Sequence, residues 1–393
     1  MNVSGASHSH VPKSQPYYHA LDLFRGGAAF LVVLEHARNY LWVDYPDVPF
    51  PSLIVKAMFF ISQLGQEAVL LFFVLSGCVV GRIIIDSCAQ GTWNWRVYLF
   101  ARFTRLWIVL VPAVLLTAAL DSISLAIAPH GSFVHSGNFA HIQHQPLAEH
   151  LGLLLLLGNL FFVQTILVPT FGSNGPLWSL ANEFWYYIAF PLLWVPFFGK
   201  MKWWERAFSI TAGVVVLVFS GPRIFGYFPL WLLGAMAYLC GQRVRVKRPV
   251  AVLLSGVSFS ATMGALALSR IGFFEKLAVP LLGPWAIGVS FSFCVYSALC
   301  LDLPPVIRSV GGFFSGFSYS LYLVHLPVLT LLVVPFIRSN IDRLQPGPLA
   351  FTLLAGTLLA LYAFAFAFYR LTEQNTPVLR RWLKRRSKET YSR

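Results

Sequence analysis

About eleven long apolar stretches follow one another along this chain of 393 residues. Most are close to the roughly 20 residues that an α-helix needs to cross the hydrocarbon core of a bilayer. Only 11% of the residues are charged, whereas a soluble domain averages roughly 25% because its surface must be hydrated. The sequence therefore predicts an all-α, polytopic integral membrane protein whose solvent is lipid.

The domain organisation follows from the limits of these stretches. A polar N-terminal tail is expected at 1–18, a membrane domain at 19–372 and a basic cytoplasmic tail at 373–393. The N-terminus has no charged segment followed by an apolar run of the kind found in signal peptides, so we expect it to be retained. The approximate limits of the apolar stretches are 20–42, 66–85, 98–128, 148–168, 178–198, 207–221, 224–240, 249–268, 277–300, 313–336 and 348–370.

The net charge of +14 lies in short basic clusters between apolar stretches. This distribution is typical of cytoplasmic loops and argues against a nucleic-acid partner. The loops at 82–105 and 199–206 are both predicted to be cytoplasmic, yet three apolar stretches separate them. One of the three is therefore predicted to be re-entrant, peripheral or a hairpin, and the Gly- and Pro-rich segment at 169–177 suits that role. We expect about ten transmembrane helices, with both termini inside.

Histidine is the commonest metal ligand, so a site is conceivable, but the pattern of cysteines and histidines does not favour one. The five cysteines form no C-x-x-C pair and are expected to be small buried hydrophobes. Five histidines lie in the polar loop at 129–150, but their spacing is irregular and no Cys or Asp completes a ligand set. We expect this loop to be solvated on the outer side.

The first apolar stretch carries Arg25, Glu35 and His36. A charged side chain inside a membrane helix costs about 2.5–3.5 kcal/mol on insertion scales and is a functional hypothesis by default. Arg25 and His36 are eleven residues apart, which is almost three helical turns, so both project from one face roughly 16 Å apart. The alternative is that the two side chains extend to opposite interfaces. Gly26 and Gly27 favour close approach of a helix or ligand beside Arg25.

The sequence resembles the bacterial membrane-bound acyltransferase family 3. Arg25 and His36 match the family pattern of an Arg, ten residues and a His in the first helix. Four further stretches match in order along nearly the whole chain: LLFFVLSGCVVGR at 70–82, the R-x-x-R of Arg102 and Arg105, GPLWSLANEFWYYIAFPLL at 175–193, and FSYSLYLVHLPVL at 317–329.

Two departures from the family pattern concern the site and the domain organisation. The acidic pair that commonly follows PLWSL is reduced here to Glu183, which would have to serve alone. Some members carry a C-terminal esterase-like domain, whereas this chain is expected to be the stand-alone form.

The resemblance implies transfer of an acyl group, commonly acetyl, from a cytoplasmic acyl-CoA to a carbohydrate hydroxyl on the outer side. Guanidinium groups bind phosphate, so Arg25, Arg102 and Arg105 are candidate anchors for the donor. His36 is the candidate general base that removes a proton from the acceptor hydroxyl. Glu35, Glu183 or another acid would orient His36 and stabilise the imidazolium.

Four further residues are candidate substrate contacts: Trp178, Ser179, Tyr322 and His325. For three of them a purely structural alternative stays open. Trp178 suits an interfacial aromatic belt, Ser179 an ordinary helix-packing hydroxyl, and His325 a hydrogen-bonded histidine in the core.

The sequence thus predicts a multi-pass O-acyltransferase of the bacterial inner membrane, with membrane lipid, acyl-CoA and a carbohydrate acceptor as partners. Proteins of polysaccharide biosynthesis or export are further partners to expect. Acyl-CoA is a co-substrate, and the chemistry needs no metal or tightly bound cofactor. Two alternatives stay open: a transporter of an anion or sugar, and an inactive structural subunit of a polysaccharide export complex.

Overall fold

The computed structural model describes residues 19–128, 147–198, 201–277, 279, 281–339 and 342–381. Within these ranges every regular element is a helix, and the two β-bridges are isolated residue pairs. The prediction of an all-α fold is confirmed.

Among the residues that the structure describes, six helices are long and apolar enough to cross a membrane by length and composition, and two shorter helices are also apolar. The shorter pair is α2 (Leu53–Ser62) and α11 (Leu282–Ala298). This measure does not reach the expected count of about ten spans. The six long helices are α3 (Gly65–Ala89), α4 (Trp95–Ile127), α8 (Gly221–Arg243), α9 (Arg248–Arg270), α13 (Ser318–Arg338) and α14 (Pro348–Leu371).

The remaining helices are shorter or more polar, and in α1 the expected site residues contribute to the polarity together with Asp22 and Arg38. This helix has 23 residues and contains Arg25, Glu35 and His36. The helices of this group are α1 (His19–Leu41), α5 (Leu153–Leu160), α6 (Leu177–Trp194), α7 (Trp203–Phe219), α10 (Phe273–Lys276) and α12 (Pro305–Gly316), joined by the short 3₁₀ turns η1 (Tyr45–Asp47), η3 (Leu147–His150), η4 (Val195–Phe197) and η5 (Glu373–Asn375).

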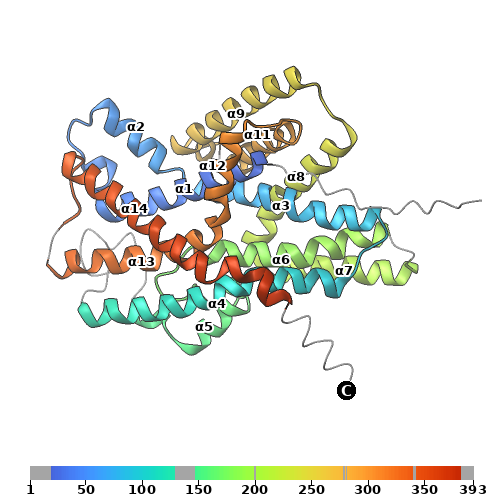
Figure 1. Ribbon diagram of the computed structural model, residues 1–393, viewed down its shortest axis with the longest axis horizontal. Coiled ribbons are helices and arrows are strands. Elements are labelled where there is room, and N and C mark those ends of the chain that lie inside the picture. Colours follow the sequence, from blue (N-terminus) through green and yellow to red (C-terminus); the bar gives the residue numbers. More distant parts are fainter. Residues whose placement is uncertain are drawn as a thin grey trace, which may run out of the picture.

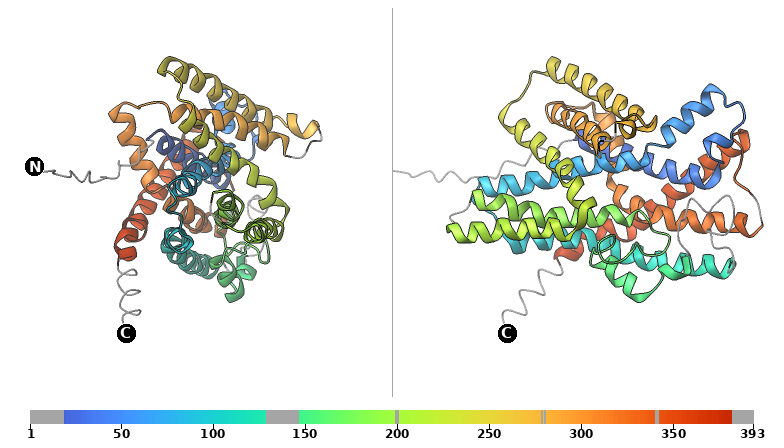
Figure 2. Two further views of the ribbon diagram at one scale, coloured as in Figure 1. Left: turned by 90° about the vertical axis from the view of Figure 1, so that its right-hand side faces the viewer. Right: turned by 180° about the vertical axis from the view of Figure 1, so that it is seen from behind.

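Helices α3, α4, α6, α7 and α13 run roughly along the longest axis of the molecule, whereas α8 and α9 are inclined to it and α12 crosses it steeply (Figure 1). The view along this axis shows α3, α4 and α6 nearly end-on (Figure 2). Helix α1 packs against α3, α12, α13 and α14. This central position places its polar side chains among several helices.

The apolar stretch at 313–336 is not one helix. Helix α12 ends at Gly316 and α13 begins at Ser318, so the stretch contains a sharp change of direction. Three glycines in and just before this segment, at 311, 312 and 316, lower its helix propensity. Gly311 also allows close packing on α1, because a Cβ atom there would lie 3.2 Å from the backbone nitrogen of Leu23.

Helices α3 and α8 cross at backbone contact through a reciprocal pair of glycines. A Cβ atom on Gly77 would lie 1.8 Å from the carbonyl oxygen of Trp231, and one on Gly234 would lie 1.8 Å from that of Val74. No other residue type fits such a distance. Small residues permit this close approach in membrane proteins, where dispersion contacts drive helix association.

In the described part of the segment between α4 and α6, residues 147–176, no helix is long enough to cross a membrane. Helix α5 has eight residues, which span roughly 12 Å against a hydrocarbon core of roughly 30 Å. Residues 161–176 then return to α6 without forming a helix. The structure therefore agrees with the expectation of one non-spanning stretch here.

Buried side chains satisfy the irregular backbone of this segment, as a low-dielectric environment requires. The Asn159 amide donates to the carbonyl of Pro169 at 3.0 Å and accepts from the backbone nitrogen of Phe171 at 3.1 Å. Asp121 of α4 accepts from both the backbone nitrogen and the hydroxyl of Ser173, each at 2.7 Å. These bonds fix the loop that precedes α6.

Candidate active site

Helix α1 lines three cavities in the described part of the chain, and predicted catalytic or donor-binding residues lie in two of them. Arg25 lines one of them, which we call the arginine cavity because Arg102 and Arg105 line it too. His36 lines the other, which we call the histidine cavity. Arg25 and His36, which are predicted to lie three turns apart on one helix, thus line two different cavities.

The arginine cavity collects all three predicted donor anchors. In the described residues, Arg25 has no ion pair or hydrogen bond through its side chain, although it is partly buried. The Arg102 guanidinium lies 5.9 Å from the ring centre of Tyr98 and 5.8 Å from that of Tyr187. Three guanidinium groups around one cavity favour a ligand that carries phosphate or another anion.

Glu183 lies in the arginine cavity and not beside His36. Its carboxylate accepts hydrogen bonds from Ser76, at 3.0 Å, and from Tyr187. Ser76 in turn accepts from the indole of Trp231 at 3.2 Å. Glu183 is therefore the acceptor in a polar cluster that joins α3, α6 and α8.

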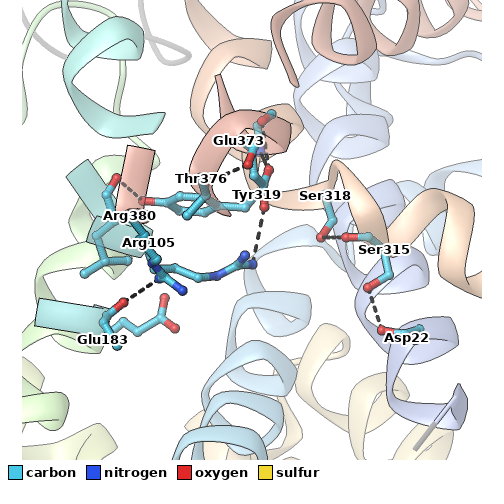
Figure 3. Close-up of polar contacts among 12 residues, drawn as sticks. Asp22, Arg105, Glu183, Ser315, Ser318, Tyr319, Glu373, Thr376 and Arg380 are labelled. Carbon is cyan, nitrogen blue, oxygen red and sulfur yellow. Dashed lines mark hydrogen bonds and ion pairs between the residues drawn. The ribbon is translucent and has the colours of Figure 1, made fainter. Parts of the chain in front are cut away.

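The start of the predicted C-terminal tail packs against this region. Glu373 forms an ion pair with Arg105 at 3.3 Å and accepts from the hydroxyl of Ser320 at 2.9 Å. Arg380 donates to the hydroxyl of Thr104 at 2.8 Å and to the carbonyl of Ala101. Figure 3 shows Arg105 reaching from α4 toward Glu373. Residues beyond 381 lie outside the described part of the chain.

The histidine cavity has a volume of about 500 Å³, within the range of small-molecule sites. Helices α1, α3, α6, α8 and α13 all contribute to its wall. Its lining combines charged, polar and aromatic side chains: Glu35, His36, Asn39, Tyr40, Asp44, Gln66, Trp178, Arg223, Tyr227 and Tyr322.

The hydrogen bonds of His36 define its tautomer. Its Nδ1 atom lies 2.9 Å from the carbonyl oxygen of Val32. A carbonyl oxygen only accepts, so in the neutral ring Nδ1 carries the proton and Nε2 keeps its lone pair. A neutral imidazole with a free Nε2 atom at a cavity wall is equipped to accept a proton.

His325 of α13 is the second partner of His36. Its Nε2 atom lies 3.2 Å from Nδ1 of His36, while its own Nδ1 atom donates to the carbonyls of Leu321 and Tyr322 at 3.1 and 2.9 Å. The Nε2 atom of His325 is therefore an acceptor for the Nδ1 proton of His36. Because His325 is fully buried, the structure places it behind His36 and not on the wall of either cavity.

Glu35, the predicted orienting acid, has other partners. It accepts from the backbone nitrogen of Gln66 at 2.9 Å and lies 3.9 Å from Arg270. Arg270 also pairs with Glu67 at 2.8 Å. Within the described ranges, no hydrogen bond joins Glu35 or Glu183 to His36. The expectation that one of these acids orients the imidazole finds no supporting contact, and a carbonyl and a histidine take that position.

Val69 and Tyr322 line both cavities and form part of the wall between them. The Tyr322 hydroxyl donates to the carbonyl of Pro176 at 3.1 Å and lies 2.7 Å from the hydroxyl of Ser179. Ser179 lines the arginine cavity and Trp178 the histidine cavity. The predicted substrate contacts are thus divided between the two spaces.

The described residues contain no group of three or more His, Cys, Asp or Glu side chains that could hold a metal ion. Of the histidines in the loop at 129–150, only His150 belongs to a described element, η3. The other four, at 130, 135, 141 and 144, lie outside the described residues.

Sequence reasoning missed three features of the site. It listed His325 as a substrate contact or a core residue, and only the packing of α13 on α1 brings it to His36. It singled out neither Glu373 nor Arg223. A signal existed for Glu373, since an acid directly after the last apolar stretch stands out in a basic tail.

Comparisons with known proteins identify the family. The model of the Acyltransferase domain family matches residues 18–370, so the chain belongs to that family. Acyltransferase MdmB of Streptomyces mycarofaciens is 30% identical over 181 residues, which cover 44% of this chain and 39% of that relative. The chain thus aligns with about two fifths of the curated relative it matches. No solved structure matches the chain.

The fold and the family together define the class of this protein. It is a membrane protein whose described elements are all helices, and it is a member of an acyltransferase family. Predicted site residues of its first helix line two of its cavities.

Proposed function

We propose that this protein is a membrane O-acyltransferase that moves an acyl group, acetyl in the simplest case, from acyl-CoA to a hydroxyl of a cell-surface or exported carbohydrate. One observation carries the proposal. Helix α1 presents an unpaired guanidinium, Arg25, to one cavity and a proton-accepting imidazole, His36, to a second cavity that shares part of its wall with the first.

The donor occupies the arginine cavity. Phosphate groups of acyl-CoA bind Arg25, Arg102 and Arg105 by charge-assisted hydrogen bonds. The thioester extends along α1 past Tyr322 and Val69, which line both cavities. The three-turn separation of Arg25 and His36 is of the right order for the pantetheine arm.

The acceptor hydroxyl enters the histidine cavity and lies against Nε2 of His36. Nε2 removes the hydroxyl proton as the oxygen attacks the thioester carbon, and the carbon–sulfur bond breaks to release the CoA thiolate. The new imidazolium keeps its Nδ1 proton between the carbonyl of Val32 and Nε2 of His325. This pair of acceptors does for His36 what the carboxylate does in a Ser-His-Asp triad.

The proposal includes an orientation in the bacterial inner membrane. The arginine cavity faces the cytoplasm, where acyl-CoA is made, and both termini are cytoplasmic. Three basic residues of α4, Arg96, Arg102 and Arg105, agree with the positive-inside bias, and the last two line this cavity.

Purified protein in nanodiscs, supplied with radiolabelled acetyl-CoA and extracts of cell-envelope saccharides, tests this function. We expect release of free CoA together with label in a saccharide fraction, and loss of both in His36→Ala. A folded His36→Ala variant that transfers label at the wild-type rate would refute the mechanism. A wild-type protein that takes up a sugar or anion but releases no CoA would identify a transporter, and one that does neither would fit a structural subunit.

A further inference from the structure

Arg223 is the only Lys or Arg side chain among the described residues that line the histidine cavity. It belongs to the first turn of α8, is exposed, and lies with its guanidinium carbon 5.2 Å from the ring centre of Trp178. Tyr227, one turn further along α8, lines the same cavity. A guanidinium stacked on an indole is held in place, yet its N–H groups stay free at the ring edge.

The other charges of this cavity are already paired. Asp44 forms an ion pair with Arg343 at 2.7 Å. Glu35 lies 3.9 Å from Arg270, and the buried Arg38 interacts electrostatically with Glu35 and Asp44. Arginines that do not themselves line the cavity thus compensate the charges of its two carboxylates, Glu35 and Asp44.

Arg223 has no such partner. No ion pair joins it to a carboxylate anywhere in the described part of the chain. In the orientation proposed above, the turn between α7 and α8 faces outward, where the positive-inside bias disfavours Arg. Arg223 is thus an arginine without an ion pair among the described residues, at a cavity wall on the outer side of the membrane. We expect its partner to be an anionic group of a bound ligand.

We infer that the histidine cavity selects an acceptor that carries a negatively charged group, either a carboxylate or a phosphate, and that Arg223 binds this group while Trp178 and Tyr227 contact the sugar ring. The inference rests on the proposed function, because it takes the histidine cavity as the acceptor site. It narrows the acceptor from any carbohydrate to an acidic or phosphorylated one.

Binding of three soluble probes without acyl donor tests this inference: methyl β-glucoside, methyl β-glucuronide and glucose 1-phosphate. Each is titrated against the purified full chain in nanodiscs, and the shift of its melting temperature gives an apparent Kd. We expect at least one anionic probe to bind about three- to fivefold more tightly than the neutral glucoside, the size of one partly exposed charge pair. The glucuronide and phosphate arms then distinguish the two kinds of anion.

Three variants isolate the charge at position 223. Arg223→Gln should bind charged and neutral probes alike, whereas Arg223→Lys should keep a preference because it keeps the charge. Arg338→Gln is the matched control, because it removes a positive charge from the exposed end of α13. Arg338 lines none of the described cavities. It should behave like the wild type.

Two outcomes overturn the inference: a wild type that responds equally to all three probes, and an Arg223→Gln variant that keeps the full preference. The result stays separate from that of the proposed function. A protein that prefers an anionic probe but never releases CoA from acetyl-CoA refutes the proposed transfer and not the anion site. A protein that releases CoA but treats the probes alike refutes only the anion site.

Discussion

The Nε2 atom of His325 lies 3.2 Å from the Nδ1 atom of His36, although 289 residues separate the two along the chain. Both Nδ1 atoms face backbone carbonyls of their own helices. These carbonyls require both Nδ1 atoms to be protonated in the neutral rings, so the free nitrogen of His36 is Nε2. Backbone carbonyls of α1 and α13 thereby determine that His36 accepts a proton at Nε2.

His325→Ala should slow acyl transfer by up to about tenfold, because the imidazolium of His36 loses one hydrogen-bond acceptor. The weaker base should also move the acidic limb of the pH–rate profile to lower pH. His325→Gln offers a side-chain oxygen and should recover part of the rate. Steady-state kinetics between pH 5 and 9 would measure the rate and the position of the acidic limb. A His325→Ala variant that is slower but keeps the wild-type acidic limb would show that His325 only contributes to packing.

Arg25→Gln should raise KM for acetyl-CoA by about ten- to a hundredfold, the loss of one hydrogen bond to a charged group. With acetyl-pantetheine, which lacks the CoA phosphates bound in our proposal, wild type and variant should have the same KM. Arg245→Gln, an exposed change at a basic loop, is the control for lost positive charge. An equal penalty with both donors would show that Arg25 does not bind phosphate.

Gly77→Ala should destabilise the protein by about 1–3 kcal/mol or prevent folding, because its Cβ atom would overlap the carbonyl oxygen of Trp231. Gly256→Ala on α9 is the matched control, since nothing lies within 4 Å of a Cβ atom there. Melting temperature and yield of folded protein in nanodiscs measure both variants. Equal stability of the two would mean that α3 and α8 do not meet at backbone contact.

Asp121→Asn should loosen the loop before α6, because Ser173 donates to both carboxylate oxygens and the amide replaces one of these oxygens with an NH2 donor. Trp178 follows this loop and lines the histidine cavity, so we expect a higher KM for the acceptor. Faster hydrogen exchange over residues 169–176 would report the local opening. Asp302→Asn, whose side chain is fully exposed, should change neither quantity.

Local chemistry made much of the fold predictable. Stretches such as 98–128 and 348–370 are apolar over a full bilayer thickness, and they are helices within a few residues of the expected limits. The Gly- and Pro-rich segment near 175 was expected to break the helical pattern, and it does. Periodicity also placed Arg25 and His36 on one helix face, since that follows from 3.6 residues per turn alone.

The pattern of residues along the sequence did not predict the contacts between distant segments. The sequence contains Glu35 beside His36, and neighbouring positions suggested a shared role. A helix turns by about 100° per residue, so Glu35 faces Gln66 and Arg270 instead. Glu183 likewise bonds Ser76 and Tyr187, because α6 packs there against α3.

The amino-acid sequence by itself determined that this chain lives in lipid, that it is helical, and that its first helix carries a guanidinium and an imidazole on one face. Hydrophobic periodicity and the cost of buried charge act within one segment, so they can be read from it. Only the tertiary structure decided which groups serve His36 and Arg105, namely His325 and Glu373. Hydrogen bonds and ion pairs need their two partners within a few ångströms, and helix packing alone brings residues so far apart in the chain together.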